Sequence, residues 1–436
     1  MSDLDRTYRI GPIHLAPTVT RLQGWTLLLG AFFSIGLMTF ISIGQTYILN
    51  EHLGIPTSEQ GTISGDLVFW TEIITLIFFI PVGIVVDRIG RRSIFALGFL
   101  LLAATYLLYP NAAGVDDLYA YRFVYALGVV TIAAGLSTVL ADYPAERSRG
   151  KLVAIVGLLS GLGIVFTNQG FGALPKALIE RGMDGVQAGY YTHYAVAALA
   201  ITVAVLVFLG LQKGIPVRRE ERPSVRDLFL SGFSHARNPR VLLSYAAAFI
   251  ARGDQSVNAT FLILWGTTAG LAAGMETAEA VKNGTIIFVL AQVAALVWAP
   301  IMGPIMDRMD RVSGLALSMV LAAIGNLSVI WLVDPMPGTG MVFYILLGIG
   351  QISVYLGAQS LIGQEAPAAK RGSVLSAFNV AGAIGILLIT AVGGRIFDAI
   401  DPRAPFVLVG IINILLFFGC ILVRLRFSSP AMTTAD

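Results

Sequence analysis

The sequence predicts an all-α membrane protein with twelve transmembrane helices in two six-helix halves. Hydrophobic residues make up 56% of the 436 residues and charged residues only 13%, far below the roughly 25% charged residues of a soluble domain. The apolar residues gather in twelve runs, each close to the length of about 20 residues that a helix needs to cross the hydrocarbon core. In addition, a charged motif between two of these runs returns half a chain later.

Short polar loops separate the twelve predicted spans in all but one place. The spans are expected at residues 22–50, 57–86, 92–110, 116–141, 150–174, 188–212, 239–269, 278–306, 312–333, 338–365, 372–396 and 404–427. The longer connection, residues 213–238, is basic and contains two prolines, so it is predicted to be a cytoplasmic linker between an N-terminal bundle (1–212) and a C-terminal bundle (239–436). Its basic residues could also touch anionic headgroups of the membrane lipids, although a solvated linker is the simpler interpretation.

The distribution of basic residues predicts the orientation of the spans. Of the 29 Lys and Arg residues, 22 lie on the side that holds both termini and the linker. Loops that carry an excess of Lys and Arg stay in the cytoplasm. We therefore expect a multi-pass protein of the cell (inner or plasma) membrane with both termini in the cytoplasm.

A charged hairpin motif follows the second predicted span and is repeated after the eighth. The first copy comprises Gly83, Asp87, Arg88, Gly90 and Arg91, and the second comprises Gly303, Asp307, Arg308 and Arg311, each 220 residues later. Six spans separate equivalent positions, and because six is even the two halves share one orientation. This arrangement predicts an axis along the membrane normal and a central site between the halves.

The repeated motif resembles the loop signature of the major facilitator superfamily. Two further groups fit the pattern of that family: Asp142 with Arg149-Gly150 before span 5, and Glu365 with Arg371-Gly372 before span 11. The resemblance covers the whole chain and implies a monomeric transporter that works by alternating access. The sequence departs from the pattern at Asp310, which stands where the first copy has Gly90. It also lacks the Gly-Pro pair in span 5 that is typical of drug–proton antiporters.

The resemblance also implies that the hairpin motifs form a cytoplasmic latch. Its predicted members are Gly83, Asp87, Arg88, Gly90, Arg91, Asp142, Arg149, Asp307 and Arg308. Asp87 ends its own helix, where the dipole disfavours an anion, so it is expected to bind Arg88, Arg149 or the first amides of span 11. Gly83 should allow a close helix approach and Gly90 a positive φ. Alternatively, the arginines only determine topology.

Four ionisable residues lie inside predicted spans: Glu72, Arg122, Arg252 and Asp254. Each costs roughly 2.5–3.5 kcal/mol near a helix centre, so function or pairing is expected. Desolvation makes reversible protonation of Glu72 and Asp254 feasible, and Arg122 resembles the span-4 arginine of proton-coupled family members. Arg122 and Arg252 could also bind an anionic substrate, or Arg122 could snorkel to the periplasmic surface. The structural alternative is an ion pair of Asp254 with Arg122 or Arg252, although the i, i+2 spacing separates Arg252 from Asp254.

Uncharged polar residues in the spans predict a wet, substrate-binding cavity. Gln351, Tyr355 and Gln359 recur every four residues and so share one helix face. The other predicted lining residues are Gln45, Asn258, Gln292 and Asn379. Hydrogen bonding between helices is the alternative role for each amide.

These observations predict a secondary active transporter that moves a small organic solute, possibly an anion, by proton symport. The alternative is a proton-driven multidrug or lipid exporter. A channel would not need titratable residues at mid-membrane. No P-loop, HExxH or nucleophile–base pair occurs in the sequence, so neither an enzyme nor a cofactor is expected. The lone Cys420 supports neither a disulfide nor a metal site, and no basic patch with aromatic residues suggests nucleic acid.

Overall fold

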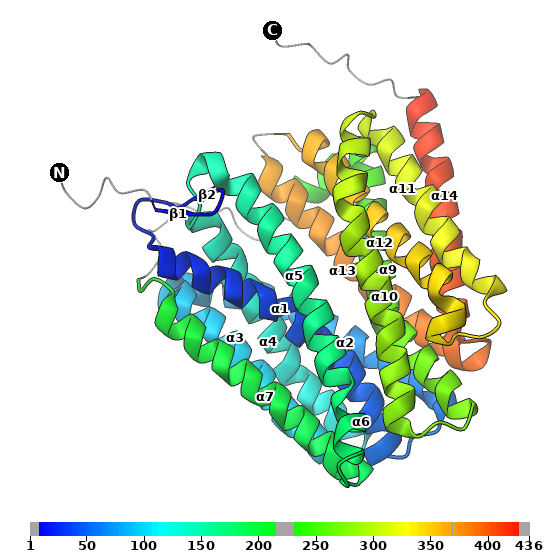
Figure 1. Ribbon diagram of the computed structural model, residues 1–436. Coiled ribbons are helices and arrows are strands. Elements are labelled where there is room, and N and C mark those ends of the chain that lie inside the picture. Colours follow the sequence, from blue (N-terminus) through cyan, green and yellow to red (C-terminus); the bar gives the residue numbers. More distant parts are fainter. Residues whose placement is uncertain (1–7, 215–230, 368–369, 427–436) are drawn as a thin grey trace. The chain divides into compact units, whose positions relative to one another are not determined.

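The computed structural model describes residues 8–214, 231–367 and 370–426, and the side chain of Asp87 lies outside that description. Twelve long helices occur in the described part: α1 (Arg21–Tyr47), α2 (Thr57–Ile89), α3 (Arg91–Leu108), α4 (Val115–Asp142), α5 (Arg149–Gly172), α7 (Gly185–Gly210), α9 (Pro239–Ala272), α10 (Thr277–Asp307), α11 (Arg311–Ser328), α12 (Pro337–Glu365), α13 (Arg371–Ala399) and α14 (Ala404–Arg426). They agree with the predicted spans to within a few residues, so the twelve-helix prediction is confirmed (Figure 1).

Eleven of the described helices are long and apolar enough to cross a membrane. The remaining long helix, α9, carries Arg252, Asp254 and Asn258 in its central turns. Shorter elements complete the described chain: strands β1 (Arg9–Ile10) and β2 (Ile13–His14), the helix α6 (Leu174–Ile179), a π-helical turn at Ile48–His52, and 3-10 turns at Tyr109–Asn111, Glu146–Ser148 (η4), His235–Arg237 (η5) and Val329–Trp331.

Side chains or a glycine mark several helix ends. Thr20 and Gln23 form a capping box at the start of α1, each side chain bonding the backbone N–H of the other. Gly90 separates α2 from α3 with a φ of 97°, which confirms the predicted positive φ. Asp310, at the equivalent point of the second motif, instead accepts a 3.0 Å hydrogen bond from the N–H of Ser313 and caps α11. At this helix boundary the second motif therefore has a side-chain N-cap where the first has a glycine with a positive φ.

The chain forms two compact units. Unit 1 contains Met1–Ile63, Trp70–Arg219 and Gly266–Val289, whereas unit 2 contains Ser64–Phe69, Glu220–Trp265 and Leu290–Asp436. A short piece of α2 thus belongs to unit 2, and the end of α9 with the start of α10 belongs to unit 1. The two sequence halves, 1–212 and 239–436, stay a prediction, and residues 215–230 of the linker lie outside the described part.

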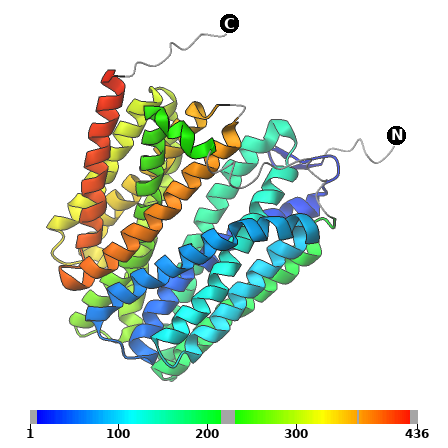
Figure 2. The same cartoon turned by 180° about the vertical axis from the view of Figure 1, so that it is seen from behind.

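Close helix crossings in unit 1 rely on glycine. In this unit α3 packs against α4 and α7, and α1 packs against α5 (Figure 1 and Figure 2). A Cβ on Gly163 of α5 would overlap the carbonyl oxygen of Phe32 in α1. The start of α10 packs on the end of α5, where Gly172 faces the side chain of Thr285, and Lys176 pairs with Glu279 at 2.9 Å. Small residues of this kind let membrane helices approach closely.

Glycines also mark close helix crossings in unit 2. Here α11 packs against α12 and α14 (Figure 1), and Gly385 of α13 lies against the backbone of Phe249 in α9. The α2 segment of this unit places Gly65 against the Thr390 carbonyl. Beside it, Arg395 donates to the Asp66 carboxylate at 2.8 and 3.3 Å.

The glycine crossing of α1 and α5 yields a stability prediction. Gly163→Ala should lower the free energy of unfolding by about 1–3 kcal/mol, because overpacking forces the backbones apart. Gly157→Ala in the same helix is the matched control. No atom lies within 4 Å of a Cβ there, and alanine favours a helix over glycine by about 1 kcal/mol. Thermal unfolding of both variants in detergent measures the difference, and equal shifts would contradict the packing argument.

Candidate functional site

A cluster of four buried polar side chains occupies the interior of unit 2. Asp254 and Asn258 come from α9, Asn326 from α11 and Gln351 from α12; the first three are fully buried and Gln351 is 5% exposed. Asn326 Nδ2 donates to both Asp254 oxygens at 3.3 Å, and Asn258 Nδ2 lies 3.2 Å from Asp254 Oδ1. Asn258 Nδ2 also donates to Gln351 Oε1 at 2.8 Å. Helices α9 and α11 therefore meet at the carboxyl group, and α12 joins the cluster through the contact of Gln351 with Asn258.

The Asp254 carboxyl is compensated by amides alone. No ion pair involves Asp254 among the described residues of its unit, in agreement with the i, i+2 spacing that separates it from Arg252. The Oδ1 atoms of Asn258 and Asn326 are buried and have no hydrogen-bond partner in the described structure. Buried amide oxygens without partners are rare and mark places where a proton, water or ion can be accommodated.

Unit 1 contains a buried cation, Arg122. Its side chain donates to Gln45 Oε1, and its guanidinium lies 5.0 Å from the ring centroid of Tyr125 and 5.9 Å from that of Tyr109. Arg122 is only 2% exposed, so it does not snorkel to the surface. It has no carboxylate partner in the part of the chain that the structure describes, and its Nε has no hydrogen-bond acceptor. Glu72 is half-buried and its charge acts on Tyr125.

The other residues predicted to line a cavity in this part of the chain differ in their exposure. On α12, Gln351 is buried, Tyr355 half-buried and Gln359 exposed. Gln292 is half-buried, and Asn379 and Arg252 are exposed. Arg252 lies against Gly382 of α13, on a different side of α9 from Asp254. Of this polar set, only Gln351 joins the Asp254 cluster through a hydrogen bond among the described residues.

The predicted latch residues form local contacts within each unit. Arg91 pairs with Asp142, and Arg149 donates to Glu146 at 3.1 Å and to the Ala141 carbonyl at 3.4 Å. Arg88 is exposed, and the side chain of Asp87 lies outside the described residues, so its predicted partners stay a prediction. No atom lies within 4 Å of a Cβ built on Gly83, so within its unit no close approach occurs there, and an approach by the other half stays a prediction.

The second motif is paired differently. Asp307 binds Arg311 at 3.1 Å and Arg308 donates to the Pro304 carbonyl at 3.5 Å. Arg371 donates to the Gly363 carbonyl, eight residues earlier, at 3.4 Å, which repeats the contact of Arg149 with the carbonyl eight residues before it.

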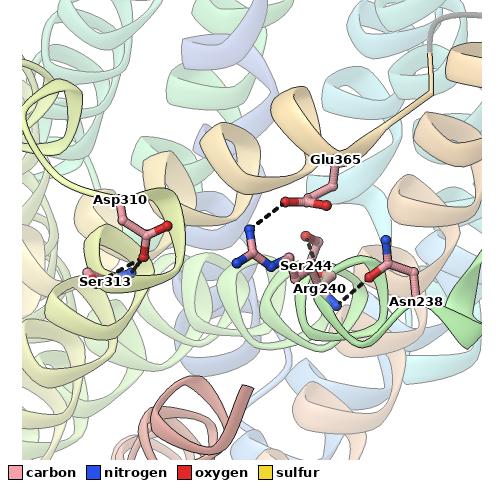
Figure 3. Close-up of polar contacts among 6 residues, drawn as sticks. All are labelled: Asn238, Arg240, Ser244, Asp310, Ser313 and Glu365. Carbon is pink, nitrogen blue, oxygen red and sulfur yellow. Dashed lines mark hydrogen bonds and ion pairs between the residues drawn. The ribbon is translucent and has the colours of Figure 1, made fainter. Parts of the chain in front are cut away.

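A buried ion pair ties the start of α9 to the end of α12. Figure 3 shows the Arg240 guanidinium directed at Glu365, and the two groups lie 3.2 Å apart. Their side chains are 8% and 14% exposed. Asn238 accepts from the Arg240 N–H at 3.0 Å, so the backbone at the start of α9 is fixed as well.

Residues 27–285 and 247–434 match the family model described as Major Facilitator Superfamily. The chain belongs to the major facilitator superfamily. Its members are transporters, so the prediction of a multi-pass transporter rather than an enzyme is confirmed. The chain is similar to the magnetosome protein MamH of Paramagnetospirillum magneticum, with 27% identity and 87% of each chain covered. It is also 26% identical to MamZ of the same organism, over 86% of this chain and only 58% of the MamZ length.

A solved structure supports the fold of this superfamily member. The nucleoside transporter NupG superimposes with a TM-score of 0.72 over 92% of this chain and 99% of its own, at 14% sequence identity. This likeness extends to the fold and not to the cargo.

Sequence reasoning missed Asn326, Arg240 and the two tyrosines that flank Arg122. Asn326 is an asparagine within a predicted span, the signal used for Asn258 and Asn379, but nothing in the sequence connects it with Asp254. Tyr109 lies in a short 3-10 turn directly after α3.

The Asp254 cluster yields a second stability prediction. Asn326→Ala should cost about 1–3 kcal/mol, because it leaves a buried carboxyl with one fewer donor. Asn413→Ala is the matched control, since Asn413 is also fully buried in unit 2, and its described hydrogen bond stays within its own helix, at the Val409 carbonyl. Denaturant unfolding in detergent measures both. In an Asp254→Asn background the cost of Asn326→Ala should shrink; an unchanged cost would show that the two side chains are not coupled.

Proposed function

We propose that this protein is a secondary active transporter that carries a small organic anion by alternating access, together with a proton. It works in the cell membrane with both termini in the cytoplasm, as the excess of basic residues on that side indicates. The observation that carries the proposal is the Asp254 cluster, a fully buried carboxyl held by amides and by no cation among the described residues.

The chemistry of the cluster suits a group that gains and loses a proton. An ionised carboxylate out of water is costly unless a cation pairs with it, so proton uptake is the direct way to remove the charge. The amides of Asn258 and Asn326 donate N–H groups to the carboxylate. After protonation, rotation of either amide would offer its unpartnered Oδ1 to the new O–H. An asparagine can therefore stabilise both states of the carboxyl.

Arg122 supports an anionic cargo. A buried guanidinium without a carboxylate partner among the described residues needs a negative charge nearby at some stage of the cycle. Its planar donors match a carboxylate or phosphate, and Nε remains available. Tyr109 and Tyr125 hold the cation in place through their ring faces. Arg252 is exposed and is a weaker candidate for the same role.

Protons can supply the driving force for this transport. Each elementary charge that moves down a membrane potential yields about 2.3 kcal/mol per 100 mV. The hairpin motifs, with the Arg91–Asp142 pair as their described ion pair in unit 1, are the proposed latch of the transport cycle. Lipid and water are the only other partners that the proposal needs, and a monomer is sufficient.

Proton coupling predicts the behaviour of Asp254→Asn in proteoliposomes. The wild-type protein should acidify the lumen when organic acids are added outside, and the variant should lose this proton entry. Asp116→Asn, which makes the same charge change in the first turn of α4, is the control. Acidification by Asp254→Asn equal to the wild type would reject Asp254 as the coupling group and leave Glu72 as the candidate. Proton movement driven only by amphipathic cations would favour an exporter.

Anion binding predicts a selective effect of Arg122 variants. Arg122→Gln should raise KM for the transported acid by about 10–100-fold, which corresponds to the loss of a charged hydrogen bond of about 1.5–3 kcal/mol. Initial rates at increasing acid concentration measure KM. Arg181→Gln removes an arginine in the connection after α6 and should leave KM unchanged. If Arg122→Gln lowered the maximal rate without raising KM, the arginine would not hold the cargo.

A further inference from the structure

An N-terminal β-hairpin, residues 8–16, docks on the connection between α4 and α5. Its apolar side chains Ile10, Ile13 and Leu15 are 5%, 2% and 1% exposed. Gly24 in the first turns of α1 makes room for this docking, since a Cβ there would overlap Ile10 and touch Leu15. The hairpin thus covers the start of α1 and cannot be an unattached tail.

The hairpin reaches the connection through its backbone. Ala16 donates to the Tyr143 carbonyl at 2.8 Å, and Ala145 donates to the His14 carbonyl at 2.9 Å. The N–H of His14 donates to the Ser148 hydroxyl at 3.0 Å. These three bonds hold residues 143–148 along the whole length of the connection, and such bonds fix backbone position more strictly than apolar contact does.

A predicted latch residue lies at each end of the α4–α5 connection. Asp142, directly before Tyr143, pairs with Arg91, and Arg149 directly follows Ser148. Asp142 is exposed, and a surface ion pair contributes little unless its geometry is fixed. Asp142 is the last residue of α4, and the hairpin binds Tyr143, the residue directly after it.

In the described part of unit 2 the equivalent elements are joined by a different contact. There the buried pair Arg240–Glu365 links the start of α9 to the end of α12, whereas in unit 1 the hairpin links the start of α1 to the end of α4. The same junction is therefore made once by a buried ion pair and once by a docked backbone segment. The β-hairpin is joined by hydrogen bonds between uncharged groups, so its attachment is electrostatically weaker than the ion pair. The β-hairpin also contains a titratable side chain.

That side chain is His14, whose Nδ1 lies 3.3 Å from the Ser148 hydroxyl. Among the described residues, the charged groups that act on it are cationic: Arg147 of η4, Arg9 of β1 and Lys151 of α5. Partial burial first, and then these three cations, lower the pKa of His14 below its usual value of 6.5. The docked hairpin therefore binds fewer protons than the released one. Docking is fully favoured above about pH 6.5 and weakens as pH falls below it.

We propose that the N-terminal β-hairpin positions the α4–α5 connection for the Arg91–Asp142 ion pair. We further propose that protonation of His14 releases the β-hairpin from this connection. His14 is a positioning residue in this scheme, because it acts on the latch through Ser148 and Tyr143. The consequence for transport rests on the proposed function: acid delivered by a proton symporter to the side of the hairpin would loosen the latch. Release of the hairpin itself needs no transport.

Hydrogen exchange of the purified protein in detergent tests release. The wild-type amides of Ala16 and Ala145 should exchange at the same rate as in His14→Asn at pH 7.5. At pH 5.5 they should exchange about fivefold faster than in that neutral variant, the factor for roughly one hydrogen bond of net stability. His14→Lys, a permanent cation, should exchange fast at both pH values. His235→Asn is the matched control, a histidine outside the long helices that contacts Ser231 rather than the hairpin.

Two outcomes of this experiment would overturn the proposal. One is a ratio of wild-type to His14→Asn exchange that stays constant between the two pH values. The other is loss of the pH response in His235→Asn instead of His14→Asn. Comparison with the neutral variant at each pH removes the intrinsic pH dependence of exchange.

A second measurement tests whether the hairpin acts through the latch. His14→Lys should change the rate of acid-driven lumen acidification, and this change should vanish in an Asp142→Asn background. An equal change in both backgrounds would reject the positioning role. If the wild-type protein gives no acidification at all, the proposed transport function fails, while the exchange experiment still decides whether His14 controls the hairpin.

Discussion

The absence of water from the membrane interior is the constraint on which the rest of this structure depends. Each backbone N–H and C=O must find a partner inside the protein, and a helix satisfies this need locally. Hydroxyl groups follow the same rule. Thr26, Thr105 and Thr285 each donate to the carbonyl four residues earlier in their own helix. Apolar side chains meanwhile remain exposed over the helices, including Phe79 and Leu209 at 62% and 70%, as suits a surface that meets lipid.

Buried charge is handled in two ways that have different functional uses. Around Asp254 the protein supplies amides, which can donate or accept, so the cluster tolerates a change in protonation. Around Arg122 it supplies the amide oxygen of Gln45 and the faces of two tyrosines, an arrangement that stabilises a cation. The first environment is suited to a group that changes its protonation, whereas the second keeps a fixed positive charge, which the proposed anionic cargo would neutralise. The two residues occupy different compact units.

The sequence predicted the helices well because hydrophobic run length is a local property, and lipid exposure makes it strong. It also predicted the positive φ of Gly90, since a break between two charged helix ends needs it. It failed for contacts between helices. Asn326 lies 72 residues from Asp254, and no periodicity links them. At Gly83 no close approach occurs within its unit, because a small residue permits such an approach without requiring it. The N-terminal β-hairpin was not predicted, because strands of two residues are too short to show an alternation of apolar and polar side chains.

The two copies of the repeat place their structural elements at equivalent positions, but the side-chain contacts at these positions often differ. Arg149 and Arg371 make the same bond to a carbonyl eight residues earlier, because that contact needs only a helix end and one guanidinium. Other equivalent positions have diverged: Gly90 breaks a helix by its backbone, and Asp310 starts one by its side chain. The junction between the first helix and the fourth is a hairpin in one unit and a buried ion pair in the other. A buried pair costs several kcal/mol to break by removing one partner, whereas a docked hairpin can open in small steps. The contact between the first and fourth helix therefore allows the two units to respond differently to the same change in pH.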